Sequence, residues 1–132
     1  MSGRKSTAAR TTRPEARVKV WLELDGRYVF GHGLSEILKA VEAAGSIKEA
    51  ARQLDKSYRY VWGRIKKAEA SLGEALVQTQ VGGQGPCRST LTASARRLVR
   101  DYDALRQRMF AVVRQEFARR FVPPPLPRRG RC

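Results

Sequence analysis

The sequence predicts an α+β fold that is mainly α: a winged helix-turn-helix with an N-terminal β-hairpin and a long C-terminal helix. Three observations predict it. Apolar and polar residues alternate over residues 18–24, and Asp25-Gly26 follows at once. Two short helical patterns come next, and each begins at a capping serine, Ser46 and Ser57. A third pattern keeps the helical period over residues 92–121 without an internal glycine or proline.

The hairpin rests on a period of two. The alternation indicates a strand with one buried face, formed by Val18, Val20, Leu22 and Leu24. Asp25-Gly26 is a strong hairpin signal, because a type I′ turn needs a positive φ at both central residues. Residues 27–30 are the predicted return strand. A first helix follows, with apolar residues at helical spacing and Gly45 as its C′ residue: Leu34, Ile37, Leu38, Val41 and Ala44.

Two short helices joined by a tight turn predict a helix-turn-helix. Residues 46–49 (Ser-Ile-Lys-Glu) form a capping box, in which the serine accepts from the N3 amide and the glutamate reaches back to the cap amide. Asp55-Lys56 ends this helix. Ser57 caps the third helix, which runs to Gly73. Tyr58 lies at the border between core and groove. The helix has apolar residues at helical spacing: Tyr58, Val61, Trp62, Ile65, Ala68 and Leu72.

A β-loop and a long helix complete the pattern. Residues 75–81 and 88–91 are predicted strands on either side of the glycine-rich segment 82–87, the place of a wing after a recognition helix. Thr92 caps a helix of roughly 45 Å. The domain at 18–91 cannot cover that length, so we expect a second copy to pack on its apolar stripe. The predicted dimerisation residues are Leu98, Tyr102, Leu105, Met109, Val112 and Val113.

Composition predicts one compact domain with basic arms. The 132 residues are 42% hydrophobic, and 27 Lys and Arg face 12 acids, a net charge of +15. That charge favours anionic polymers as partners, DNA first. The expected organisation is a disordered basic arm (1–17), a winged helix-turn-helix (18–91), a dimerisation helix (92–121) and a Pro/Arg-rich tail (122–132).

The expected location is the cytoplasm, in association with the nucleoid. The longest apolar run is far shorter than a membrane span, and the basic N-terminus leads into an alternating segment rather than the apolar core of a signal peptide. Cys87 and Cys132 lie far apart, which suits neither a disulfide framework nor a metal site.

The outward face of the third helix carries the candidate DNA-binding residues. Guanidinium groups match guanine O6 and N7, and hydroxyls and lysines match phosphates. We expect Arg59 and Tyr60 to contact base edges and Arg64, Lys66 and Lys67 to contact phosphates. The second helix and the wing add further candidates. The full set is Lys48, Ser57, Tyr58, Arg59, Tyr60, Arg64, Lys66, Lys67, Gln84 and Arg88.

The same residues have a second interpretation, the solvated basic face of an ordinary helix. Two positions, Trp62 and Gly63, bear on the choice between DNA binding and a solvated face. Trp62 lies at the border of the apolar stripe, and we assign it to the core. Gly63 weakens the helix by roughly 1 kcal/mol relative to alanine. It therefore predicts the close approach of either DNA or a neighbouring helix.

Catalysis, cofactors and metals find no support in the sequence, so we expect a protein that is not an enzyme. His32 is the one histidine and has no carboxylate arrangement beside it. Residues 82–87 lack the Gly-Lys-Ser/Thr of a phosphate-binding loop and lie between strands.

Several strings in the chain resemble a known family. They are Leu34-Ser-Glu-Ile-Leu-Lys-Ala-Val41, Gly45-Ser-Ile-Lys-Glu-Ala-Ala-Arg-Gln-Leu54, Ser57-Tyr-Arg-Tyr-Val-Trp62, Gly73-Glu-Ala-Leu-Val77, Gly82-Gly-Gln-Gly85 and Leu91-Thr-Ala-Ser-Ala95. Together they resemble the N-terminal winged helix-turn-helix of molybdate-responsive ModE-type transcription regulators, which is related to that of LysR-type regulators. The resemblance implies dimerisation through 92–121 and a third helix, from Ser57 to Lys66, in the DNA major groove.

Two departures limit what the resemblance implies. Full-length members continue into molybdate-binding domains, which these 132 residues do not match, so oxyanion sensing is not implied. The long helix and Lys66-Lys67 are also more basic than in the family. The expected function is a homodimeric, sequence-specific regulator of bacterial type on a roughly palindromic operator of double-stranded DNA. The alternatives are a nonspecific nucleoid organiser and an interaction adaptor that uses Pro123–Pro127.

Overall fold

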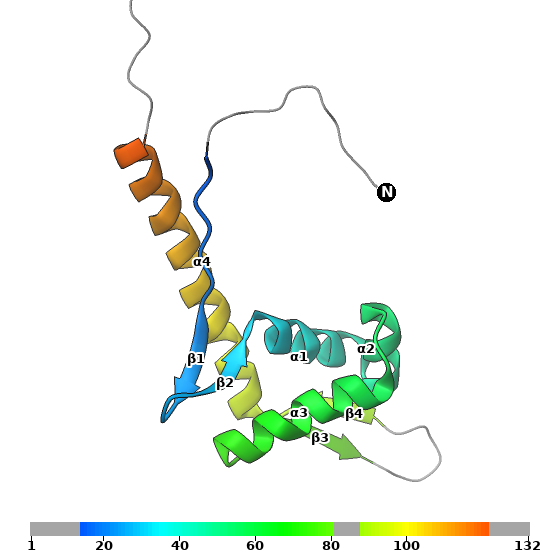
Figure 1. Ribbon diagram of the computed structural model, residues 1–132. Coiled ribbons are helices and arrows are strands. Elements are labelled where there is room, and N and C mark those ends of the chain that lie inside the picture. Colours follow the sequence, from blue (N-terminus) through cyan, green and yellow to red (C-terminus); the bar gives the residue numbers. More distant parts are fainter. Residues whose placement is uncertain (1–13, 81–87, 122–132) are drawn as a thin grey trace, which may run out of the picture. The chain divides into compact units, whose positions relative to one another are not determined.

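The computed structural model describes residues 14–80 and 88–121 (Figure 1). The elements run β1 (Trp21–Leu24), β2 (Arg27–Gly31), α1 (His32–Ala44), α2 (Ile47–Leu54), α3 (Tyr58–Leu72), β3 (Val77–Gln80), β4 (Arg88–Leu91) and α4 (Ala93–Phe121). This order confirms the predicted fold class of hairpin, helix-turn-helix, wing strands and long helix. Most of the predicted basic arm, the wing loop with Gln84 and Cys87, and the tail with Cys132 lie outside the described residues.

The chain divides into two compact units, which are described separately. The larger unit runs from Lys19 to Met109 and therefore includes the first part of α4. The smaller unit combines the chain up to Val18 with the chain from Phe110.

The N-terminal hairpin forms as predicted at its turn and differs along its strands. Asp25 and Gly26 have φ values of 53° and 77°, which confirms the predicted turn. β1 and β2 pair antiparallel, with a register shift between Leu22 and Glu23. The unpaired extra residue, Val29, lies in β2, so the alternation of side chains along β1 is unchanged. Leu24 pairs with Arg27 beside the turn and is 50% exposed, so its predicted place in the buried face is wrong.

Side-chain caps set the starts of three helices. The hydroxyl oxygens of Ser46, Ser57 and Thr92 accept from the backbone N–H three residues ahead, at 3.0, 2.9 and 3.1 Å. These contacts confirm the predicted starts of α2, α3 and α4. The capping box also predicts a bond from the Ser46 backbone N–H to the Glu49 carboxylate. In its place, the Glu49 carboxylate binds the Arg52 guanidinium at 2.7 Å.

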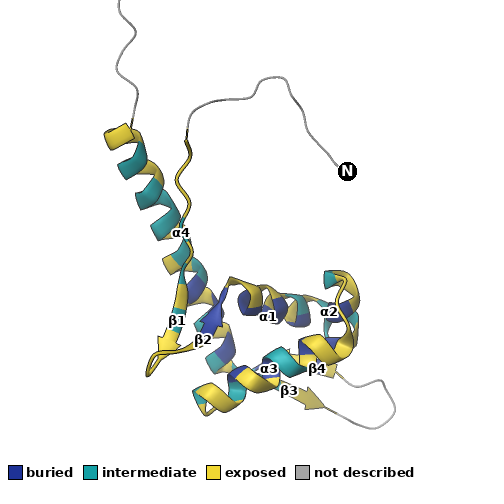
Figure 2. Cartoon of the chain, in the orientation of Figure 1, coloured by how far each residue is buried: buried dark blue, intermediate teal, exposed yellow. Residues whose placement is uncertain are grey.

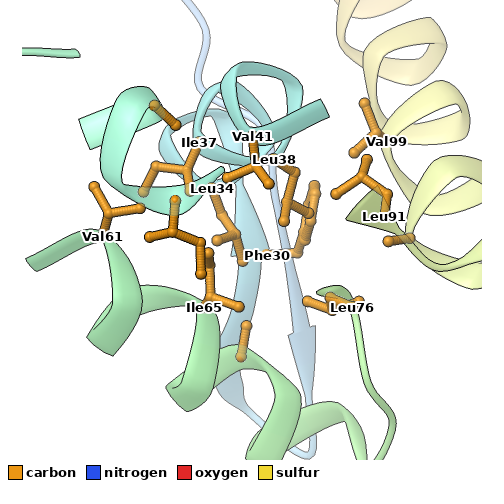
Figure 3. Packing of buried hydrophobic residues seen from close by; sticks show 14 of the residues in the cluster. Phe30, Leu34, Ile37, Leu38, Val41, Val61, Ile65, Leu76, Leu91 and Val99 are labelled. Atoms are coloured by element: carbon orange, nitrogen blue, oxygen red, sulfur yellow. The ribbon is translucent and has the colours of Figure 1, made fainter. Parts of the chain in front are cut away.

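The core lies where α1, α3, β2 and the start of α4 meet (Figure 3). Phe30, Leu38 and Val61 are fully buried in it. α3 contributes Val61, Ile65 and Ala68, and these alone of its side chains are buried (Figure 2). Because three side chains on one line of the helix enter the core, the rotation of α3 about its axis is fixed.

Tyr102 belongs to this core and not to a surface for a second copy. Its side chain is 2% exposed, and its ring meets the edge of Phe30 at 5.2 Å between centroids. Its hydroxyl donates to the Val20 carbonyl at 2.7 Å. The prediction that Tyr102 mediates dimerisation is therefore wrong, because the hairpin and α1 already cover its position in the helical stripe.

A polar network joins α4 to α1. The buried Ser35 hydroxyl donates to one carboxylate oxygen of Asp103 at 2.8 Å, and the Lys39 ammonium binds the other at 2.7 Å. Burial works to raise the pKa of Asp103, but the bonds from Lys39 and Ser35 hold it below its usual 3.8. The carboxylate therefore stabilises the fold above that pH, and this contribution is lost as the pH falls through the depressed pKa.

In the smaller unit, the N-terminal segment lies against the end of α4. Ala16, Arg17 and Val18 line a cavity of 170 Å³ together with Phe110, Val113 and Arg114. Further along, the Phe117 and Phe121 rings stack at 4.9 Å. Val113, a predicted dimerisation residue, thus faces a segment of its own chain.

The Asp103 network yields a stability prediction. Asp103→Ala should lower the free energy of unfolding at pH 7 by about 1–3 kcal/mol, because the Ser35 hydroxyl stays buried without its acceptor. The deficit should shrink as the pH falls from 3.8 through the depressed pKa of Asp103, because the wild-type carboxylate then becomes protonated. Urea denaturation at several pH values measures both effects.

The neighbouring Asp101 supplies the matched control. Its ion pair with Arg100 is exposed, with side chains 65% and 69% accessible, so Asp101→Ala should change stability by less than about 0.5 kcal/mol. Equal losses in the two variants would contradict a specific role for Asp103.

Candidate nucleic-acid interface

The surface of α3 opposite the core is the first part of the candidate interface. With Val61 and Ile65 turned inward, the helical period places Arg59, Gly63 and Lys67 on the outward side. Arg59, Tyr60, Lys66 and Lys67 are all exposed (Figure 2). We call this surface, formed by Arg59, Tyr60, Gly63, Lys66 and Lys67, the open face of α3.

Two aromatic residues lie beside the open face rather than in the core. Tyr58 is 51% exposed and Trp62 is 43% exposed, so the assignment of Trp62 to the core is wrong. Both stand at the border of the apolar stripe, where burial depends on whether another element covers them. No element among residues 14–80 and 88–121 does so, and the Lys66 ammonium lies 5.7 Å from the centre of the Trp62 ring.

Tyr60 and Arg64 form a coupled pair. A guanidinium nitrogen of Arg64 donates to the Tyr60 hydroxyl at 2.9 Å, and the Lys56 ammonium lies 5.4 Å from the centre of the Tyr60 ring. Arg64 is half-buried, so its guanidinium group is held in one position. The Tyr60 hydroxyl accepts from Arg64 and keeps its own proton to donate.

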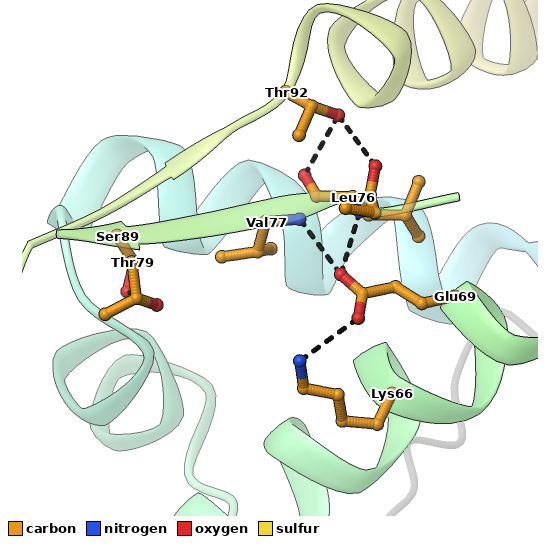
Figure 4. A network of polar contacts seen from close by, with 8 residues as sticks. Lys66, Glu69, Leu76, Val77, Thr79, Ser89 and Thr92 are labelled. Carbon is orange, nitrogen blue, oxygen red and sulfur yellow. Dashed lines mark hydrogen bonds and ion pairs between the residues drawn. The ribbon is translucent and has the colours of Figure 1, made fainter. Parts of the chain in front are cut away.

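Glu69 anchors the wing strands to α3 (Figure 4). One carboxylate oxygen accepts from the backbone N–H groups of Leu76 and Val77 at 2.8 and 3.2 Å, and the other pairs with Lys66 at 3.2 Å. Burial acts to raise the pKa of Glu69, but these bonds hold it below its usual 4.5. Sequence reasoning missed this residue, although an acid on an otherwise basic helix was the available signal.

A groove beside α3 brings together residues that lie far apart in the sequence. It has a volume of about 510 Å³ and runs between the start of α2, the first residue of α3 and the wing strands. Its lining includes two cations, two hydroxyl side chains of β3 and β4, and an exposed tyrosine: Lys48, Arg88, Thr79, Ser89 and Tyr58. We call it the wing groove.

The cations of these two surfaces differ from others in the unit. Lys39, Arg52 and Arg96 are each held by a carboxylate of their own chain. Lys48, Arg59, Lys67 and Arg88 form no ion pair within the part of the chain that the structure describes, and Lys66 alone of the predicted set does. Unpaired cations on α4, such as Arg97 and Arg108, add to the same excess. The arrangement suits a polyanion.

Other kinds of site are absent over residues 14–80 and 88–121. No group of three or more His, Cys, Asp or Glu side chains there is placed to hold a metal ion. His32 lies exposed at the start of α1. In the same residues, no helix has both the length and the apolar character needed to cross a membrane.

Comparison with known proteins identifies the family that this geometry resembles. Residues 34–96 match the bacterial regulatory helix-turn-helix proteins of the lysR family. The match covers α1 to the start of α4, and thus includes α3 and the wing strands.

Two curated relatives confirm the resemblance to ModE. The DNA-binding transcriptional dual regulator ModE of Escherichia coli K12 is 28% identical over 93 residues, which are 70% of this chain and 36% of that protein. The transcriptional regulator ModE of Yersinia pestis is 30% identical over 91 residues, 69% of this chain and 35% of that protein. The chain thus spans about a third of the length of the relatives it matches.

A solved structure confirms the fold. The crystal structure of the DNA-binding domain of CbnR in complex with DNA matches 67% of this chain and 97% of that chain. The TM-score is 0.50 and the sequence identity is 25%.

Proposed function

Because residues 34–96 match the bacterial regulatory helix-turn-helix proteins of the lysR family, we propose that this chain is a sequence-specific, DNA-binding transcription regulator of ModE-like type. In this proposal it acts in the bacterial cytoplasm as a homodimer on a roughly palindromic operator, and it carries out no catalysis. Its partner is double-stranded DNA.

One observation carries the proposal: Lys48, Tyr58 and Arg88 come from three elements and meet in the wing groove, directly beside the open face of α3. The cations there are not neutralised by carboxylates of the described chain. Phosphate contacts supply much of the affinity of DNA-binding proteins, and base contacts supply the specificity. The wing groove can supply the phosphate contacts, and the adjacent open face of α3 can supply the base contacts.

The open face of α3 is the part that enters the major groove. Arg59 and Tyr60 lie in its first turn, where recognition helices reach base edges. Arg59 has the donors for guanine O6 and N7. Lys67 and the Lys66 ammonium reach phosphates at the groove walls, while Arg64, directed by Tyr60, contacts the backbone at the other border.

The wing groove holds the adjoining DNA backbone. Lys48 and Arg88 neutralise phosphates there, and the Tyr58 hydroxyl donates to one. Ser57 also serves, because its oxygen accepts the capping bond from Tyr60 while its proton remains free to donate to a phosphate. Gln84 is proposed to act from the wing loop, outside the described residues.

A second copy pairs along α4. Leu105 is 40% exposed, and Leu98, Met109 and Val112, each partly buried, lie on the same side of the helix. An apolar stripe of this kind is stabilised by packing against its twin. Two recognition helices would then meet successive major grooves, roughly 34–36 Å apart, on a palindromic site.

The specificity claim is tested by selecting bound sequences from a random DNA pool at about 150 mM salt, where surface charges are screened beyond about 8 Å. The proposal predicts a palindromic motif bound about 10³-fold or more above random DNA. Arg59→Ala should flatten the preference at one base position of each half-site.

Two other results of this experiment would have different meanings. A pool that binds without enrichment would indicate a nonspecific DNA organiser, a function that the unpaired arginines of α4 also suit. A uniform loss of affinity in Arg59→Ala, with every preference retained, would place Arg59 on a phosphate instead.

The dimer is tested separately. Leu105→Asp combined with Met109→Asp buries two like charges in the paired stripe, so light scattering should report a monomer where the wild type is a dimer. Ala104→Asp with Gln107→Asp adds the same charge on the other side of α4 and should leave the dimer intact. A dimer that survives the first pair would contradict this interface.

A further inference from the structure

Gly63 is a helical residue for which the fold provides no explanation. It is not among the glycines with positive φ, which are Gly26, Gly45 and Gly73. A Cβ atom built on Gly63 meets nothing within 4 Å. No neighbouring helix therefore approaches this position, and that sequence-based explanation is wrong. Since glycine is among the weakest helix formers, alanine would serve the isolated fold better.

Gly63 is itself partly buried, and the side chains around it leave part of its backbone accessible. Lys66 lies on one side and is drawn away by Glu69 at 3.2 Å and the Trp62 ring. Tyr60 lies on the other side and is bonded to Arg64 at 2.9 Å. By helical spacing, these two sets of partners lie on opposite flanks of the open face. The centre of the face is thus a notch whose floor is the Gly63 backbone.

The chemistry of this floor is apolar. In the interior of α3 the Gly63 N–H belongs to the helical hydrogen-bond ladder, so it has no donor to offer. What remains is the Cα methylene, which makes van der Waals contact only. The apolar group that projects from base pairs into the major groove is the 5-methyl group of thymine.

We propose that the Gly63 notch receives a thymine 5-methyl group and makes Gly63 a specificity-determining position. The inference rests on the proposed function, because it requires α3 to lie in the major groove. The absent side chain lets the base-pair edge approach the helix backbone, while Arg59 and Lys67 border the same notch. A methyl group on residue 63 would then compete with the methyl group of thymine for one space.

The test adds a methyl group to residue 63 and removes the 5-methyl group from the DNA, separately and together. It uses the full chain and the operator found by selection. Gly63→Ala should weaken binding to that operator about tenfold, the scale of one misplaced methyl group in a fitted site. Replacing one thymine of each half-site by deoxyuridine should weaken wild-type binding, and it should restore the binding of Gly63→Ala. Affinity for random DNA should change less than about twofold, since phosphate contacts are unaltered.

Two controls separate binding from folding. The thermal unfolding midpoint of Gly63→Ala should be at or above that of the wild type, because the added methyl group meets open space and favours the helix. Ala70→Leu places more bulk on the same side of α3, two turns further on, and should leave operator affinity within about twofold.

Each failure has its own meaning. If Gly63→Ala binds the operator as the wild type does, or no deoxyuridine restores its affinity, the thymine contact is wrong while sequence-specific binding stands. If Ala70→Leu weakens binding equally, the notch is not the point of contact. If the wild type shows no sequence preference, the proposed function itself fails and takes this inference with it.

Discussion

The attachment of α3 to the core determines which residues of this helix the candidate interface presents. Val61, Ile65 and Ala68 are buried on one line of the helix, and this burial fixes which residues point outward. Burial of such side chains is worth roughly 1.5–3 kcal/mol for each large one, far more than a surface contact. The outward side can therefore carry residues that add nothing to stability. It carries two cations without ion-pair partners in the described chain, Arg59 and Lys67, and a glycine.

The charged residues fall into two groups: carboxylates that join elements of the fold, and cations that have no ion-pair partner in the described chain. Carboxylates act as internal anchors: Asp103 binds α4 to α1, and Glu69 binds the wing strands to α3. The pKa of each carboxyl is held below its usual value by the bonds it accepts, so both anchors are charged near neutral pH. In the wing groove, neither Lys48 nor Arg88 forms an ion pair within the described residues. Part of the net charge of +15 is thus positive charge without ion-pair partners in the described chain, on and beside α3.

Local chemistry made much of the fold predictable from sequence. The capping serines and Thr92, the Asp25-Gly26 turn and Gly45 all act within a few residues, and all lie where predicted. The predictions that were wrong concern residues whose burial depends on elements far away in the sequence. Tyr102 and Trp62 both lie at helical spacing within apolar stripes. The hairpin covers Tyr102, whereas no element of the described chain covers Trp62. Likewise, no local pattern shows that Lys48 and Arg88 line one groove, because only the contact of β4 with α1 and with the Gly45 turn before α2 brings them together.

The central claim is that one continuous surface, the open face of α3 with the wing groove, binds DNA. Backbone amide spectra of the full chain, recorded by NMR while a selected duplex is added, test it most directly. The account predicts that the largest shifts occur at residues 46–48, 57–67, 79–80 and 88–89, with small changes in the N-terminal hairpin and along α1. Largest shifts on α4 or in the hairpin, with α3 unmoved, would contradict it.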